Sequence, residues 1–255
     1  MKLWNIFLLM LLTFHLKINL AKEIELNYNP KIFDDQYKGC RMRMNTNIPR
    51  ILKNEMKSSV AFKSGWLKAK THWRKIKSNM SDLPKGFRDE HGIALVAYSG
   101  SLYSAFNNAT RKVGDSVRHY KKKFSFKAMH YYLTMAVKML SNKYKKVVYR
   151  GVSNIHFIPS NHSHGFIRFG QFTSSSEDRA VATKFGTSSF FTMQTRLGVE
   201  IQRFSQYPNE KEVLIPGYEM FKVVSFNRKT HSFKLTSKGL SKSRFNCAYF
   251  KAFNG

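Results

Sequence analysis

Apolar residues recur at helical spacing through most of the first 140 residues. Three stretches show this period, at residues 50–80, 89–113 and 126–140. In the first stretch, Trp66, Ala69, Trp73 and Ile76 lie three or four positions apart, and lysines and arginines fill the positions between them. We interpret this as a buried stripe with a solvated basic face, rather than as a helix that binds nucleic acid or membrane. The spacing predicts helices in all three stretches.

The segments outside these helices contain helix-breaking prolines or runs of charged residues. Residues 22–49 contain Asn-Pro and Ile-Pro pairs and are predicted to form an extended lead-in. The three lysines at 121–123 are expected to lie in an exposed loop. His91 and His130 fall within the helical stretches, and we assign both to the core rather than to a site.

From residue 146 onward the pattern changes to short apolar runs separated by turn signals. These runs predict strands at residues 147–152, 170–176, 189–195, 199–204, 212–215, 220–227 and 232–236. Helices come first and strands afterwards, which indicates an α+β fold rather than alternating βαβ units. Neither an internal repeat nor a linker interrupts residues 22–255, so we expect a single domain there.

The amino-terminal residues predict export. Lys2 precedes an apolar run at residues 3–14 that is too short for an ordinary membrane span and fits a secretory signal peptide. We expect the signal to occupy residues 1–21, with cleavage near Ala21. After Cys247 the chain has no second apolar segment. We therefore expect a secreted protein with neither a membrane stem nor a lipid anchor.

The cysteines and the glycosylation sequons agree with export. Cys40 and Cys247 are the only cysteines, and in a secreted chain such a pair suggests a disulfide. Two unrelated buried thiols are the alternative. Sequons begin at Asn79, Asn108 and Asn161.

The balance of charge is extreme. The 255 residues carry 44 lysines and arginines against 15 acids, for a formal net charge of +29. Such a surface attracts anions, among them nucleotides, sulfated glycans, nucleic acid and anionic lipid. Charge alone does not choose among these, but it predicts contact with a polyanion such as a glycosaminoglycan.

Candidate chemistry gathers in the strand-rich half. Glu210 and Glu212 lie one residue apart, beside the apolar run 213–215. If the strand begins at Glu210, both carboxylates face the same side. Arg150 is followed by Gly151, which permits close approach of a backbone or ligand. Ser174 and Ser176 are spaced so that both hydroxyls can face one side. Taken singly, each feature also fits a structural role, such as a charged strand end.

Together and in this order, these residues resemble the arginine-specific mono-ADP-ribosyltransferases of the secreted and cell-surface type. The similar segments are FDDQYKGC at 33–40, FKAMHYYLT at 126–134, VYRGV at 148–152, RFGQFTSSS at 168–176 and NEKEVLIP at 209–216. The resemblance covers nearly the whole mature chain. It implies two packed sheets around an NAD cleft, a helical amino-terminal part, and a bridge between Cys40 and Cys247.

The resemblance also implies a role for each candidate residue. Glu212 would stabilise the oxocarbenium-like charge that develops when the bond between nicotinamide and ribose breaks. The hydroxyl of Ser174 would brace Glu212 or the ribose, and the guanidinium of Arg150 would hold a phosphate or ribose oxygen of NAD. The backbone of Gly151 would bind the nicotinamide amide.

The acceptor side of the implied reaction involves two further residues. Glu210 would pair with the guanidinium of an arginine-containing protein acceptor and help take its proton, and Tyr207 could stack on that guanidinium. NAD is the implied co-substrate, with NADP left open, no metal is needed, and a monomer is expected.

The sequence is also compatible with a function that is not enzymatic. The chain could be an inactive, basic relative that binds glycans or nucleic acid through its lysines. The intact set of Arg150, Ser174, Glu210 and Glu212 argues against inactivity.

Overall fold

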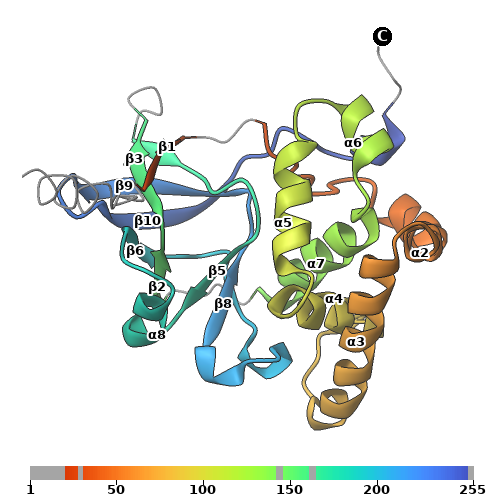
Figure 1. Ribbon diagram of the computed structural model, residues 1–255. Coiled ribbons are helices and arrows are strands. Elements are labelled where there is room, and N and C mark those ends of the chain that lie inside the picture. The colour runs from red at the N-terminus through yellow and green to blue at the C-terminus, as the bar shows by residue number, and fades with distance from the viewer. Residues whose placement is uncertain (1–20, 28–30, 142–145, 161–164, 252–255) are drawn as a thin grey trace, which may run out of the picture.

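The computed structural model describes residues 21–27, 31–141, 146–160 and 165–251. Helices lie at α2 (Arg41–Ser58), α3 (Val60–Ile76), α4 (Asp89–Ser99), α5 (Tyr103–Lys112), α6 (Val117–Lys123), α7 (Lys127–Leu140) and α8 (Arg179–Lys184), with 3₁₀ turns η2 (Lys77–Asn79), η4 (Gln202–Phe204), η5 (Pro208–Glu210) and η6 (Ala248–Phe250). Strands lie at β1 (Lys22–Leu26), β2 (Val147–Val152), β3 (Ile155–Pro159), β4 (Phe166–Ile167), β5 (Thr173–Ser176), β6 (Ser189–Gln194), β7 (Val199–Glu200), β8 (Glu212–Ile215), β9 (Glu219–Asn227) and β10 (Ser232–Ser241). Figure 1 shows the helices α2–α7 on one side and the sheet on the other.

The α+β class is confirmed, and the sheets differ in size. In the described part of the chain, one sheet has eight strands in the order β4-β9-β10-β6-β2-β5-β8-β7, and the other pairs only β1 with β3. The neighbours β2, β5 and β8 are antiparallel, with Tyr149 opposite Ser176 and Ser176 opposite Glu212. Residues far apart in sequence therefore meet at one point of the larger sheet.

The predicted extended lead-in is wrong beyond residue 40, because α2 begins at Arg41. Its inward side carries Met44, Ile48, Ile51 and Leu52 at helical spacing. Pro49, taken as a breaker, lies on the exposed side of this helix. A proline inside a helix costs about 3 kcal/mol, and the burial of four large apolar side chains outweighs that cost.

Two other predictions need correction in the helical half. The predicted helix over 89–113 is broken after Ser99, where an added Cβ on Gly100 would lie 2.0 Å from the Gln206 side chain. The predicted loop at 121–123 is instead the last turn of α6. Ser116 caps this helix by accepting the His119 N–H at 3.0 Å, and lysines in a last turn complement the helix dipole.

In the strand-rich half, β2 and β8 have the predicted bounds, whereas two predicted strands are too long. The run over 199–204 pairs only as β7, because the chain then turns into η4 to bury Phe204. The run over 170–176 pairs only from Thr173, since Gly170 has a positive φ of 76° and turns the backbone.

Aromatic side chains fill the core of the helical half. The ring of Phe33 stacks on Tyr120 with centroids 4.1 Å apart and also contacts His130. His130 is buried, and its Nδ1 lies 2.8 Å from the hydroxyl of Tyr37. The ring of His91 accepts the Arg88 N–H at 2.8 Å. Both histidines therefore have the core positions that were expected for them.

A covalent link joins two parts of the chain that are far apart in sequence. A disulfide joins Cys40 and Cys247, with Cα atoms 6.0 Å apart across a sequence separation of 207 residues. This confirms the expected bridge. Of the three sequons, Asn79 and Asn108 are exposed, and Asn161 lies outside the described residues.

The predicted signal peptide also lies outside the described residues, except for Ala21. Among the helices that the structure describes, each is too short or too polar to span a bilayer.

We expect removal of the bridge to destabilise the fold. In the chain-entropy model, a cross-link over a loop this long contributes at most about 5 kcal/mol. The double variant Cys40→Ser, Cys247→Ser should therefore unfold at a lower urea concentration than the unmodified protein. Peptide mapping without reduction should recover the linked pair, and two alkylatable thiols in the native protein would contradict the assignment.

Candidate active site

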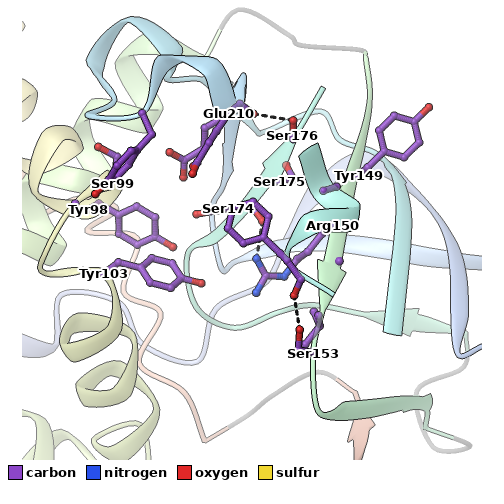
Figure 2. A pocket seen from close by; sticks show the side chains of 17 residues that line it. Tyr98, Ser99, Tyr103, Tyr149, Arg150, Ser153, Ser174, Ser175, Ser176 and Glu210 are labelled. Carbon is purple, nitrogen blue, oxygen red and sulfur yellow. Dashed lines mark hydrogen bonds between the residues drawn. The ribbon is translucent and has the colours of Figure 1, made fainter. Parts of the chain in front are cut away.

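A cavity of about 370 Å³ lies between the helical half and the sheet. Its helical wall comes from the end of α4 and the start of α5, and its sheet wall from β2, β5, α8 and the segment before β8. Figure 2 shows Tyr98 and Tyr103 pointing from the helical wall toward Arg150 and Ser174 on the opposite side. The cavity is lined by Tyr98, Ser99, Gly100, Tyr103, Tyr149, Arg150, Gly151, Val152, Ser153, Ser174, Ser175, Ser176, Ala182, Phe185, Tyr207, Glu210 and Glu212.

All six residues predicted for NAD and acceptor binding line this cavity. Arg150 lies on β2, and its Nη1 donates to the Ser174 carbonyl at 2.7 Å, which fixes the guanidinium against β5 (Figure 2). Gly151 allows the close approach that its position suggested, because an added Cβ would lie 2.2 Å from the Gly186 carbonyl and 2.3 Å from that of Ala182. No larger residue fits between β2 and α8 at this point.

The serines of β5 hold the acidic segment in place. The Ser174 side chain shares the cavity with the carboxyl of Glu212 and lowers its pKa. The Ser176 hydroxyl donates to the Glu210 carbonyl at 2.7 Å, and that of Ser175 donates to the Val213 carbonyl at 2.9 Å. The three serine hydroxyls therefore contact three different groups. The two-residue spacing had suggested that the hydroxyls of Ser174 and Ser176 face the same side of the strand.

The condition under which both acids would share one face of a strand, that the strand begins at Glu210, is not met. Glu210 ends the 3₁₀ turn η5, and Lys211 follows in the left-handed region with a φ of 46°. The strand β8 begins only at Glu212. Both carboxylates still line one cavity, because this turn folds Glu210 back over β8 instead of extending it.

The two acids differ in burial. Glu212 is 5% exposed, whereas Glu210 is half-buried. Burial raises the pKa of Glu212 from its ordinary value of 4.5 to about 7, against the opposing effects of the nearby Ser174 hydroxyl and the positive charge of Arg150. Burial also raises the pKa of Glu210. The deeper acid is therefore the one whose charge depends most on what occupies the cavity.

Several lining residues were not predicted from the sequence. Tyr98 and Tyr103 lie in the stretch predicted to be helical, and no sequence signal marked either of them as a site residue. Phe185 caps the short helix α8, and no sequence signal singled it out. The side chains of Phe185 and Tyr207 are 54% and 55% exposed, which leaves two flat rings at the edge of the cavity.

A second cavity of about 380 Å³ adjoins the first, and the two share Tyr103, Arg150 and Val152. Its walls include apolar side chains such as Phe157 and Phe169, together with Arg111 and Asn107. Asn107 is 2% exposed, and its Nδ2 donates to the Tyr98 hydroxyl at 3.3 Å. Its Oδ1 is buried without a partner. An acceptor of this kind is costly unless a ligand satisfies it.

The lining residues offer donors, carboxylates and flat rings. Within the described residues, no three histidine, cysteine, aspartate or glutamate side chains gather in a way that could hold a metal ion. The two cavities adjoin at the guanidinium of Arg150, and the first of them also contains the buried carboxyl of Glu212. This arrangement suits a long ligand that carries negative charge in its middle.

Known proteins share both the sequence and the fold. The sequence model of the NAD:arginine ADP-ribosyltransferase family matches residues 26–243. T-cell ecto-ADP-ribosyltransferase 1 of Rattus norvegicus is 42% identical over 238 residues, which cover 91% of this chain and 83% of that protein. Ecto-ADP-ribosyltransferase 5 of Bos taurus is 40% identical over 235 residues, 88% of this chain and 74% of that protein.

Solved structures agree with these relatives. Variants of the eukaryotic mono-ADP-ribosyltransferase ART2.2, in complex with NADH and with NAD, superpose with a TM-score of 0.81 at 40% identity. The match covers 89% of this chain and 99% of each of those chains. The resemblance that the motifs indicated is confirmed, and this chain belongs to the NAD:arginine ADP-ribosyltransferase family.

Proposed function

We propose that this protein transfers ADP-ribose from NAD to arginine side chains of proteins and releases nicotinamide, with slow hydrolysis of NAD as a side reaction. The observation that carries the proposal is the convergence of Arg150, Ser174, Glu210 and Glu212 on one cavity. An inactive relative would have no physical reason to keep a carboxyl as deeply buried as that of Glu212.

The dinucleotide suits the pair of cavities. Its pyrophosphate would lie near Arg150, which both cavities share, so one nucleotide could occupy each side. The nicotinamide half would lie beside Gly151 and the ring of Phe185 in the first cavity. The adenine half would lie in the second, where its amino group could donate to the unpartnered Oδ1 of Asn107. The relatives solved with NADH and NAD support such a co-substrate.

The chemistry at the ribose would depend on Glu212. When the bond between the nicotinamide nitrogen and the ribose C1′ breaks, the electron pair leaves with nicotinamide and positive charge develops on the ribose. An ionised carboxylate at this buried position, with the Ser174 hydroxyl favouring its charged form, would stabilise that charge. The positive nicotinamide ring of NAD would also favour the ionised form of Glu212 over the protonated one.

The acceptor would arrive beside Glu210. A nitrogen of the acceptor guanidinium attacks C1′, and the proton that it loses must go to a base. Glu210 is half-buried and lies next to the exposed ring of Tyr207, so its carboxylate could pair with the guanidinium while the ring stacks on it. Hydrolysis of NAD by water requires neither this ion pair nor the stacking ring.

The names of the relatives support an extracellular location. Several are called ecto-enzymes, and that of the mouse ADP-ribosyltransferase 1 includes a GPI linkage. We propose that this chain is exported through the predicted signal at residues 1–21, acts outside the cell as a single domain, and works as a monomer.

The proposed function is tested by incubating the purified protein with labelled NAD and agmatine, a free guanidinium acceptor. Labelled ADP-ribosyl-agmatine and free nicotinamide are the expected products. If neither forms while the folded protein still binds NAD, the proposal of an active enzyme fails.

For Glu212→Gln we expect a loss of NAD cleavage by about a hundredfold or more, because the amide cannot stabilise the developing cation.

The same variant should be more stable than the unmodified protein at pH 8. Folding raises the pKa of Glu212 from 4.5 to about 7. The stability linked to its proton is therefore fully present below pH 4.5, declines between pH 4.5 and 7, and is lost above pH 7.

The glutamine side chain does not titrate. At pH 8 the free energy of unfolding of the variant should therefore exceed that of the unmodified protein by up to about 3 kcal/mol. Nicotinamide release and urea unfolding at pH 5 and pH 8 measure the two effects. Near-normal nicotinamide release by the folded variant would remove the assignment of Glu212. A stability difference that stays the same at both pH values would mean that its carboxyl is not protonated on folding.

For Glu210→Gln we expect transfer to agmatine to fall by about a hundredfold, while NAD hydrolysis stays within about threefold of normal. Glu200→Gln is the matched control, because Glu200 is an exposed acid outside the cavity that pairs with Lys146. It should change neither reaction. Equal losses of transfer and hydrolysis in the Glu210 variant would overturn the division of labour between the two acids.

For Asn107→Leu we expect the KM for NAD to rise about tenfold, which corresponds to the loss of one hydrogen bond of about 1.4 kcal/mol. Inhibition by AMP should weaken by the same factor, whereas inhibition by free nicotinamide should not change. Thr110→Ser, a buried substitution on the same helix outside both cavities that keeps the sequon at Asn108, is the control. If inhibition by nicotinamide weakens as much as that by AMP, Asn107 does not act on the adenine half.

A further inference from the structure

One segment of the helical half supplies almost only positive side chains to the surface, and the exposed Asp89 beside it pairs with Lys77. Residues 41–80 span α2, α3 and η2 and contain eleven lysines and arginines but a single acid, Glu55. The carboxylate of Glu55 faces inward, where its oxygens accept the backbone N–H groups of Lys127 and Ala128 at 2.7 and 3.0 Å. The solvent-facing side of this segment is therefore free of carboxylates.

The exposed side of α3 concentrates this charge. Its buried side consists of Phe62, Gly65, Trp66, Ala69 and Trp73. Its exposed cations are Lys63, Lys68, Arg74 and Lys75, which we call the α3 basic face. Among the residues that the structure describes, Lys63, Lys68 and Lys75 form no ion pair. Their charge is available to a partner.

We propose that the α3 basic face docks a sulfated polysaccharide of the glycosaminoglycan type. Residues seven apart on a helix lie about 10 Å apart along its axis, so Lys68 and Lys75 would meet successive anionic groups of a linear chain that follows α3. Each contact would release bound counterions, which makes the interaction strong at low salt and weak at high salt. A secreted protein, as the signal at residues 1–21 predicts, would meet such chains.

The surface of α3 suits other polyanions less well. Single-stranded nucleic acid binds by stacking its bases on aromatic rings, but Phe62, Trp66 and Trp73 are buried. A helix that inserts into an anionic membrane needs a continuous apolar face, whereas the large exposed apolar residues on α3 are only Val60 and Leu67, which lie seven positions apart. A hydrophilic sulfated chain requires neither feature.

Docking at this face would leave the active site open. Figure 1 shows α2 and α3 on the side of the helical half that faces away from the sheet, with α4 and α7 between them and the strands. None of the four side chains lines either cavity. A bound polyanion would also neutralise charge that otherwise repels an arginine-rich acceptor.

The test compares two variants that remove the same charge. One carries Lys63→Gln, Lys68→Gln, Arg74→Gln and Lys75→Gln, and the other carries Lys222→Gln, Arg228→Gln, Lys234→Gln and Lys238→Gln in β9, β10 and the turn between them. All eight positions are exposed, and glutamine keeps the helix propensity of lysine. We expect affinity for heparin at 0.15 M salt to fall at least tenfold in the α3 variant and less than about twofold in the control.

Equal losses in the two variants would overturn the proposal, because binding would then follow net charge rather than this face. Single-stranded DNA and phosphatidylserine vesicles are tested in parallel. If the α3 substitutions weaken binding to either of these more than binding to heparin, the assignment to a sulfated polysaccharide is wrong. All binding is measured without NAD, and the α3 variant should modify agmatine at the normal rate.

Discussion

The carboxylates of Asp34 and Asp35 are buried side by side and accept backbone N–H groups from the far end of the chain. Asp34 accepts from Arg244 and Phe245 and also pairs with the buried Arg168 of the strand-rich half. Asp35 accepts from Cys247 and Ala248 at 2.9 and 2.7 Å. Burial raises the pKa of Asp35, while these amides oppose the rise. A buried carboxylate without such partners would cost several kcal/mol, so this pair determines how the two halves meet.

The active site depends on that junction. The Tyr98 hydroxyl donates to the Phe172 carbonyl at 2.8 Å, and Phe172 directly precedes β5. One hydrogen bond therefore fixes the helical wall of the cavity against the strand that carries Ser174. The distance between Tyr98 and Arg150 across the cavity is set by the packing of whole elements, and α4 and β2 are each held by their own core. This rigidity is what a preorganised electrostatic site requires.

Residues whose structure follows from local pattern could be predicted, and residues that depend on distant contacts could not. The bounds of β2 and β8 follow from short apolar runs. The turn at Glu210 depends on the Ser176 hydroxyl, which lies 34 positions away in sequence. Tyr98 is a buried member of the core, and it lines the cavity only because α4 packs beside the sheet. Arg150, Ser174 and Glu212 could be predicted to share one site only because their motifs resemble those of a known family. Local pattern alone does not show that these residues lie close together.

The burial of Glu212 has a consequence for how this protein changes over evolutionary time. Holding a carboxyl that must ionise in a nearly closed space lowers the stability of the fold at neutral and higher pH. A lineage that no longer used the cavity would gain stability by exchanging this acid for an amide or an apolar side chain. Neutral drift could then replace the acid while leaving the fold intact, so the fold alone gives no reason to keep a carboxyl at this position.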